Sequence, residues 1–187
     1  MMKFHKYILS ILAFVVLSIS GHETHAQQLG IKTNALMWAA MTPNFGCEFV
    51  LQDRTSLDIS VSGHYRPYGL ESQFISIQPE YRFWFNGRPM IREYVGASVM
   101  AASYDVTMGG QVYDGMAASV GLTGGYAFLI GNRWRFELCG GLSLLFFNQR
   151  QYYRNDDYFS NEFAPANAWG YKLFPAKLGV SFTYIIK

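Results

Sequence analysis

Oppositely charged residues occur two positions apart at two places in this sequence, as Glu80-x-Arg82 and Arg135-x-Glu137. Side chains two positions apart on a β-strand point to the same face of the sheet, so the members of each pair would lie side by side. Such a pair can act as an acid and a base or can form a salt bridge. Because paired charges are common inside small barrels, we interpret both pairs as structural ion pairs.

The motif Ser62-x-His64, with Asp58 on the same face, contains the residue types of a nucleophile, a base and an orienting acid. Some eight-stranded outer-membrane barrels modify lipid A, so a lipid A-modifying enzyme that uses Ser62 and His64 is one alternative function. The strand phase, however, puts both side chains on the polar face, whereas an enzyme of this kind needs a site open to the bilayer. We therefore expect no enzymatic activity, no catalytic or metal site and no bound cofactor.

Residues 73–85 read Q-F-I-S-I-Q-P-E-Y-R-F-W-F and indicate how such side chains are positioned. One parity, from Ile75 to Phe85, is apolar, and the other contains Glu80, Arg82 and Trp84, as expected of a strand with two unlike faces. A strand in a soluble protein usually has about five or six residues, whereas a tilted strand that crosses a bilayer needs about 9 to 11. The length favours a membrane-spanning strand.

The same alternation recurs along the chain and predicts eight strands, at residues 29–38, 45–51, 57–65, 74–85, 94–104, 116–130, 134–146 and 172–186. Tight turns at 52–56, 86–89 and 131–133 alternate with longer connections at 66–73, 105–115 and 148–171. An even strand number with turns at one rim and loops at the other is typical of outer-membrane proteins. We predict an all-β fold, an eight-stranded antiparallel up-and-down transmembrane β-barrel.

The N-terminal residues indicate export from the cytoplasm. Lys3 and Lys6 precede an apolar run at 7–19, and the small residue Ala26 follows a short polar stretch. This pattern predicts a secretory signal peptide at residues 1–26 and leaves 27–187 as a single barrel domain. The apolar run is too short for a transmembrane helix, which needs about 20 residues. The predicted location is the bacterial outer membrane.

Composition supports a barrel with its polar face inside. Charged residues make up 15% of the chain and aromatic residues 17%, which would cover a water-exposed surface poorly. Lys and Arg number 15 against 13 Asp and Glu, so no nucleic-acid partner is indicated. A soluble, lipocalin-like ligand-binding barrel, with the apolar face inside, has the same alternation and remains an alternative.

Seven charged residues fall on the predicted interior face, where burial is costly unless charges are paired. We predict that they form an ion-pair network that closes the lumen: Lys32, Glu48, Glu80, Arg82, Arg135, Glu137 and Lys177. Eight strands leave room only for side chains, so a porin-like conductance should be negligible.

Aromatic residues near strand ends, among them Trp38, Trp84 and Trp134, predict interfacial girdles. The last strand carries alternating bulky apolar residues and resembles the terminal strand that the outer-membrane assembly machinery recognises; the residues of this signal are Gly179, Phe182, Tyr184 and Ile186. Cys47 and Cys139 fall on strands that are not neighbours and should stay unpaired.

Five spaced motifs carry a family resemblance: 32–38 (KTNALMW), 42–48 (TPNFGCE), 78–84 (QPEYRFW), 133–137 (RWRFE) and 175–177 (PAK). Together they resemble a family of small uncharacterised outer-membrane β-barrel proteins, a domain of unknown function common in Bacteroidales. The resemblance implies a fold and a location but no reaction. Some relatives carry a cysteine pair in the last long loop, and this chain has none there.

The last long connection could hold a recognition surface for a surface protein or glycan, formed by Tyr152, Tyr153, Arg154, Tyr158 and Phe159. The alternative is that the flanking strands extend beyond the membrane and these rings cover the rim. The predicted role is structural or surface-interacting in the cell envelope. The predicted partners are outer-membrane lipid, lipopolysaccharide and the assembly machinery, and we expect a monomer.

Overall fold

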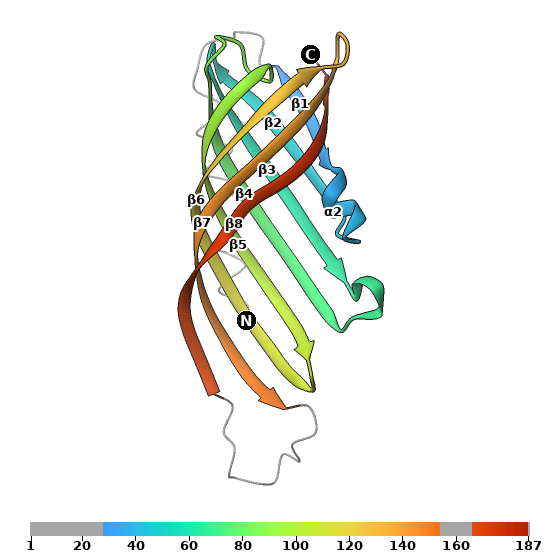
Figure 1. Ribbon diagram of the computed structural model, residues 1–187, viewed down its shortest axis with the longest axis vertical. Helices are drawn as coiled ribbons and strands as arrows, with labels where there is room; N and C mark the ends of the chain where they lie inside the picture. Colours follow the sequence, from blue (N-terminus) through green and yellow to red (C-terminus); the bar gives the residue numbers. More distant parts are fainter. Residues whose placement is uncertain (1–27, 154–165, 187) are drawn as a thin grey trace, which may run out of the picture.

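The computed structural model describes residues 28–153 and 166–186, which form one closed antiparallel sheet (Figure 1). Its strands pair in chain order and β1 pairs with β8. The strands are β1 (Leu29–Asn34), β2 (Asn44–Gln52), β3 (Thr55–Tyr65), β4 (Ser72–Trp84), β5 (Arg92–Met108), β6 (Gln111–Leu129), β7 (Trp134–Tyr153) and β8 (Ala166–Ile185). The prediction of an all-β fold with eight antiparallel strands is confirmed. The predicted signal peptide, residues 1–26, lies outside the described residues.

The first strand is shorter than predicted, because it ends at Asn34 instead of running to Trp38. The Asn34 side chain accepts a hydrogen bond from Leu36 N at 3.0 Å and caps the short helix α2 (Ala35–Ala39). Asparagine at this position satisfies a helix N–H that would otherwise have no partner. Within the described ranges, no helix has the length and apolar composition needed to cross a membrane.

Strands extend into two of the predicted loops. Of 105–115, only Gly109 and Gly110 form the turn, with φ of 60° and 83°, and Met108 pairs with Gln111. Two glycines at positive φ suit a two-residue hairpin turn, because they adopt it without steric cost. Likewise β7 and β8 extend into the predicted connection 148–171, as far as Tyr153 and from Ala166.

The strands are strongly tilted relative to the barrel axis. Leu29 on β1 pairs with Phe49, and following the register pairs around the sheet from Phe49 leads to Pro175 on β8. The closing hydrogen bond instead joins Leu29 O to Ile186 N, far along β8 from Pro175. Such a stagger is what closure of a sheet with inclined strands requires.

The two faces of the sheet differ sharply. The outward positions are large apolar side chains with much of their surface exposed, such as Leu122 at 73% and Ile75 at 61%. The inward side chains in the half nearer the β4–β5 turn, the turn half, are almost fully buried; most are polar or charged, and a small group is aromatic or apolar. Trp84, expected in an interfacial girdle, belongs to the inward set: it is fully buried and its Nε1 donates to Ser56 Oγ at 2.8 Å.

The two rims are unequal. The connections β2–β3, β4–β5 and β6–β7 gather at the end where β8 finishes, the upper end of Figure 1, which we call the turn rim. The opposite end, the loop rim, holds α2, the 3₁₀ turn η2 (Pro67–Gly69) and the β5–β6 turn. Because β5 to β8 have 17 to 20 residues and β1 only six, the wall is much taller on one side.

Candidate functional site

The most concentrated group of functional side chains is a buried set of seven charged residues inside the barrel, here called the charge cluster. Its members are Lys32, Arg82, Lys177, Glu48, Asp58, Glu80 and Glu137. Their side chains are between 0% and 8% exposed. Six strands supply them, so the cluster ties together parts of the sheet that do not pair directly.

Arg82 lies at the centre of the charge cluster and contacts all four carboxylates. Its Nη1 donates to Glu48 Oε2 at 3.0 Å and to Glu137 Oε2 at 3.1 Å. Its Nη2 donates to Asp58 Oδ2 at 2.6 Å and to Glu80 Oε2 at 3.0 Å. A planar guanidinium with several fixed donors can serve four acceptors in this way, whereas a lysine ammonium has only three donors.

The two lysines complete the charge compensation from opposite sides of Arg82. Lys177 bridges Asp58 and Glu80, with Nζ–oxygen distances of 2.9 and 2.6 Å. Lys32 bridges Glu48 and Glu137, at 2.9 and 2.8 Å, and lies 3.5 Å from Asp58 Oδ2. Three cations therefore face four anions in a space without solvent access, and each charge has at least two partners of opposite sign. Buried charges are tolerated only when they are paired in this way.

Neutral donors serve the carboxylate oxygens that the cations leave free. The hydrogen bonds are Ser56 Oγ to Glu48 Oε1 at 2.7 Å, Tyr94 Oη to Glu137 Oε1 at 2.9 Å and Thr123 Oγ1 to Glu80 Oε1 at 2.6 Å. Hydrogen bonds to a charged acceptor are stronger than neutral ones. These donors orient the carboxylates of Glu48, Glu80 and Glu137, and Asp58 is held by the cations alone.

An aromatic layer closes the interior between the charge cluster and the turn rim. The Trp84 and Tyr94 rings lie 4.7 Å apart between centroids, and the Arg82 guanidinium stacks 4.5 Å from the Tyr94 ring. Met90, from the β4–β5 connection, is 2% exposed and reaches the interior beside Gly30. The turn half of the barrel is therefore filled with side chains.

Six of the seven residues that the sequence placed in the interior network meet in the charge cluster, and Arg135 does not. Arg135 faces inward but donates from Nη1 to the carbonyl oxygens of Gly131 and Trp134, at 2.9 and 3.0 Å. Arg135 is the second residue of β7, next to the turn rim, where backbone carbonyls are closer to it than the carboxylates of the charge cluster. The prediction for Arg135 is corrected accordingly.

Asp58 belongs to the charge cluster although it was not among the seven residues predicted to form the interior network. It lies between Glu48 on β2 and Glu80 on β4 in the strand register, so three carboxylates stand in one cross-strand row. Strand phase alone put Asp58 on the interior face, and the presence of Arg82 two positions from Glu80 was the signal that this row is neutralised. One oxygen, Oδ1, has no hydrogen-bond partner among the described residues.

One comparison with known proteins decides the family. A family model described as a protein of unknown function (DUF3575) matches residues 10–186. The chain belongs to the DUF3575 family. Searches of curated proteins and of solved structures returned no match. Membership of DUF3575 supports the expected family of unknown function across nearly the whole chain, and the function must be argued from the geometry.

The candidate enzymatic residues of this DUF3575 protein have other partners. Ser62 Oγ lies 2.8 Å from Ser76 Oγ, not from the histidine. His64 lies between two hydroxyls, with Nδ1 3.0 Å from Thr42 Oγ1 and Nε2 3.0 Å from Ser72 Oγ. Asp58 is in the charge cluster. Among the described residues no group of three His, Cys, Asp or Glu side chains could hold a metal ion.

The remaining predicted residues of the DUF3575 chain are placed as follows. Phe182 and Ile186 of the terminal strand are outward and exposed, Tyr184 is outward and half-buried, and Gly179 is inward. In the last connection Tyr152 is 41% exposed. The Tyr153 side chain, Arg154, Tyr158 and Phe159 lie outside the described residues. Both cysteines, Cys47 and Cys139, are free, as predicted.

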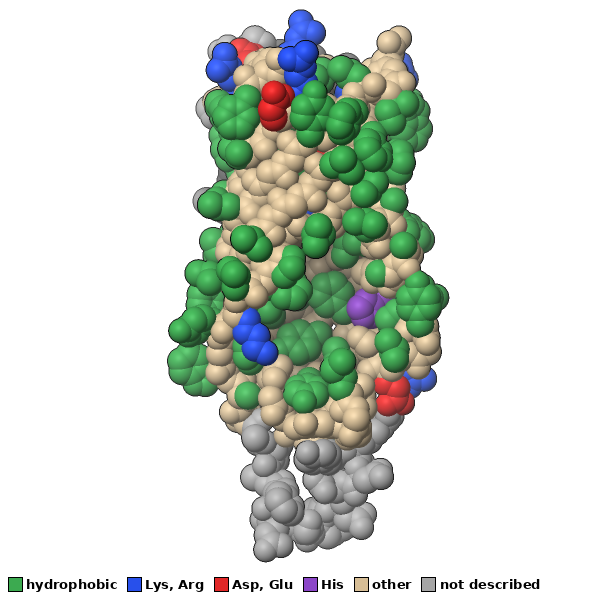
Figure 2. Space-filling model, viewed as in Figure 1, with side chains coloured by type: hydrophobic (Ala, Val, Ile, Leu, Met, Phe, Trp, Pro, Cys, Tyr) green, Lys and Arg blue, Asp and Glu red, His purple; other side chains and the backbone are tan. Residues whose placement is uncertain are grey.

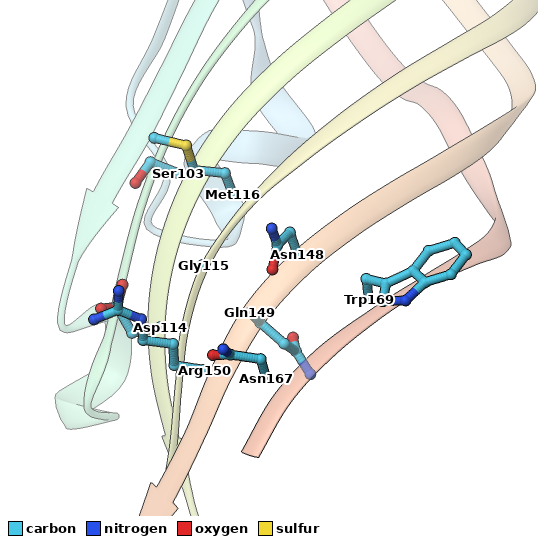
Figure 3. Close-up of a pocket in the computed structure, with 9 residues that line it drawn as sticks. All are labelled: Ser103, Asp114, Gly115, Met116, Asn148, Gln149, Arg150, Asn167 and Trp169. Atoms are coloured by element: carbon cyan, nitrogen blue, oxygen red, sulfur yellow. The ribbon is translucent and has the colours of Figure 1, made fainter. Parts of the chain in front are cut away.

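A pocket lies on the outer side of the DUF3575 barrel near the loop rim (Figure 3). Polar residues dominate its lining and include Ser103 on β5, Asp114 on β6 and Arg150 on β7. Strand register places Asp105, Asp114, Arg150 and Asn167 in one row across four strands. This row marks the place where the outer face changes from apolar to polar.

Proposed function

We propose that this protein is a β-barrel of the bacterial outer membrane with a closed, salt-bridged lumen and a structural or surface-interaction role in the envelope. The observation that carries the proposal is the inverted distribution of polarity. Arg82 and its carboxylate partners are buried inside, while large apolar side chains cover the outside. Bilayer lipid is the solvent in which an apolar exterior is favourable, because exposing so much apolar surface to water costs free energy.

The distribution argues against the soluble, lipocalin-like alternative. A soluble ligand-binding barrel encloses an apolar cavity and presents charges to water. Here the interior of the turn half is occupied by the charge cluster, and outward positions such as Met116 and Leu142 are 62% and 61% exposed. Figure 2 shows hydrophobic side chains over the height of this face, with charged side chains gathered nearer its two ends. The pattern fits a transmembrane belt.

The height of the belt agrees with a bilayer. On β5 the outward face is uncharged from Val95 to Ser103, between Glu93 and Asp105. At about 3.3 Å per residue and a tilt of about 40°, the distance from Glu93 to Asp105 is on the order of 30 Å along the barrel axis, and the uncharged stretch between them covers about 20 Å of it. On β7 the apolar positions run from Trp134 to Phe146 and end at Asn148. The polar row near the loop rim would then lie at the headgroup level, with Trp169 beside it.

The remaining parts of the proposal follow from this location. Residues 1–26 would direct export, and the terminal strand with Gly179, Phe182, Tyr184 and Ile186 would be read by the assembly machinery. Lipid and lipopolysaccharide would surround the belt. The seam between β1 and β8 closes the sheet within one chain, which supports a monomer.

Leu122→Arg tests the membrane location. Leu122 lies near the middle of the apolar belt and is 73% exposed, so in a bilayer we expect the substitution to lower the free energy of unfolding by about 2 to 4 kcal/mol. The matched control is Ile130→Arg, which has the same outward parity, is 60% exposed and lies just beyond the turn-rim end of the same strand; it should cost about 0 to 1 kcal/mol. The measurement is a urea titration of each variant inserted in phosphatidylcholine vesicles, with unfolding monitored by tryptophan fluorescence.

In a soluble barrel the same change would place a charge on a water-exposed surface and would have little effect at either position. Equal, small effects of Leu122→Arg and Ile130→Arg would therefore contradict the membrane location. So would a purified chain that stays folded and monodisperse in buffer without detergent.

The charge cluster also predicts negligible ion conductance. Its side chains fill the cross-section of the turn half, so an ion would have to break several buried salt bridges to pass. We expect no discrete current steps above the lipid baseline when the protein is inserted in planar bilayers. Steps whose amplitude changes in a Lys177→Gln variant would show that ions cross the charge cluster, and this part of the proposal would be wrong.

A further inference from the structure

The barrel wall is incomplete on one side near the loop rim. β1 pairs only with Ser181–Ile185 of β8, although β8 begins at Ala166. Where β1 ends, the Asn34 side chain continues the seam by donating to Leu178 O at 3.1 Å and accepting from Val180 N at 3.3 Å. Nearer the loop rim, β7 is the only strand among the described residues that pairs with β8. Helix α2 lies against β8 next to this point. We call the unpaired edge of β8 between α2 and the loop rim the lateral opening.

The uncovered edge has features that limit pairing with another strand. Pro175 lies in it and has no N–H to offer, and the register of β7 and β8 shifts between Gly141 and Leu142, opposite this proline. Proline and bulges are the usual devices that protect a strand edge from adding a further strand. This edge of β8 is therefore poorly suited to bind a partner strand and is left open to a small ligand.

The interior behind the lateral opening is hollow. In the turn half, inward side chains such as Glu80 and Ser181 are 0% and 1% exposed. In the loop half, inward side chains such as Met100, Leu145 and Phe147 are only partly buried, although they also point into the barrel. Figure 2, which views the molecule as Figure 1 does, shows the surface hollowed in its lower half. The charge cluster forms the closed end of this space.

The lining of the hollow suits one apolar chain with a polar end. Met100, Leu145 and Phe147 supply apolar surface from β5 and β7, and Ser60 and Ser62 supply hydroxyls from β3. Gln78 Nε2 donates to Ala176 O at 2.9 Å, and this bond crosses the barrel between β4 and β8. It separates the hollow from the charge cluster with a neutral layer.

A cationic side chain, Lys172, lies at the edge of the lateral opening. Lys172 is exposed on β8, and its Nζ lies 5.3 Å from the centroid of the Phe147 ring. Within the described part of the chain, no carboxylate forms a salt bridge with Lys172, in contrast to Lys32 and Lys177. An unpaired ammonium next to apolar surface complements an anion that is attached to an apolar chain.

We propose that the lateral opening admits the acyl chain of an anionic single-chain amphiphile from the surrounding bilayer, with its carboxylate or phosphate at Lys172. The inference rests on the proposed membrane location, which puts the opening beside lipid chains. An acyl chain that moves sideways into the hollow passes from lipid chains to the apolar side chains of Met100, Leu145 and Phe147, whereas entry from the turn rim is blocked by the charge cluster. The bound acyl chain displaces water from Met100, Leu145 and Phe147, and the binding free energy gained is proportional to the apolar area that it covers.

The test uses the full chain, inserted in phosphatidylcholine nanodiscs, and tritiated palmitate as the probe. Wild type should bind palmitate saturably, and Ala117→Phe should weaken binding at least tenfold, because Ala117 points into the hollow opposite Phe147. The matched control is Ala118→Phe, the next residue on the same strand, which points outward. It should bind palmitate as wild type does. Non-saturable binding to wild type, or equal binding by both variants, would overturn the inference.

A second variant, Lys172→Gln, tests the headgroup and does not depend on filling the hollow. It should weaken binding of palmitate and of a lysophosphatidic acid several-fold and leave binding of hexadecanol, which has no charge, unchanged. A preference of wild type for lysophosphatidic acid over palmitate would identify a phosphate as the natural headgroup, and the reverse a carboxylate. Equal losses for all three probes would overturn the role of Lys172 in binding the anion.

Failure of this inference can be distinguished from failure of the membrane location. Heat-dependent gel mobility and protection from protease in the same nanodiscs report whether each variant is a folded, inserted barrel. An inserted wild type that binds none of the three probes contradicts the lateral opening as a binding site and leaves the membrane location intact. A wild type that does not insert contradicts both.

Discussion

Arg82→Met is expected to lower the free energy of unfolding by about 3 to 5 kcal/mol, the cost typical of removing one partner from a buried ion-pair network. The guanidinium contacts four carboxylates within 3.1 Å and is fully buried. Without it, Lys32 and Lys177 remain as the only cations of the charge cluster and face all four carboxylates. Methionine fills much of the space but donates no hydrogen bond.

The measurement is the urea midpoint of unfolding of the protein in phosphatidylcholine vesicles, with the folded fraction at each urea concentration read from heat-dependent gel mobility. Arg135→Met is the matched control, because Arg135 also faces inward but contacts only backbone carbonyls. Asp58→Asn combined with Arg82→Met should recover part of the loss, because one uncompensated charge is removed. Equal costs for Arg82→Met and Arg135→Met would show that the charge cluster is not a principal source of stability.

Gly141→Ala is expected to lower the free energy of unfolding by about 1 to 3 kcal/mol or more, because the added methyl group meets the neighbouring strand itself. A Cβ at Gly141 would fall on the carbonyl oxygen of Leu122 and lie 2.9 Å from both Cα and Cγ2 of Thr123. These are mostly backbone atoms, so relief requires movement of β6 rather than rotation of a side chain. The same strand pair positions Thr123, which donates to Glu80.

The adjacent residue gives a direct control. A Cβ at Gly140 meets no atom within 4 Å, so Gly140→Ala should be neutral or slightly stabilising. The two variants differ by one position on β7 and by the face to which the methyl group points. The urea midpoints of both, measured in the same vesicles, should differ clearly. Equal midpoints would mean that the wall adjusts to a methyl group inside the barrel and that glycine is not required there.

Strand phase could be predicted from local sequence because successive side chains on a strand point to opposite faces whatever the rest of the chain does. Glu80, Arg82 and Lys177 were therefore assigned to the interior correctly from the alternation alone. Two sequence signals disagreed for Trp84. Its parity predicted an interior position, whereas its place near a strand end favoured an interfacial girdle. In the structure it is fully buried.

Element ends were harder to predict than faces. Asn34 can continue a strand or cap a helix, and the choice depends on Asn44, whose side chain pairs with the Asn34 backbone at 2.6 and 2.9 Å. The polar run 105–115 contains two glycines at a tight turn, so its composition suggested a loop although its flanks pair as strands. Pairing supplies the hydrogen bonds that override weak local preference.

By itself, the sequence determined the number of strands, the face to which each side chain points and the residues available for an interior network, because all three follow from the period of two. Only the tertiary structure decided which charges meet, that Asp58 joins them and Arg135 does not, and that β8 leaves a lateral opening beside a short β1. These outcomes depend on the stagger between strands and on where β1 ends. Contacts between distant residues set the stagger, and the Asn34–Asn44 pairing sets the end of β1. Alternation along a single strand carries no information about either.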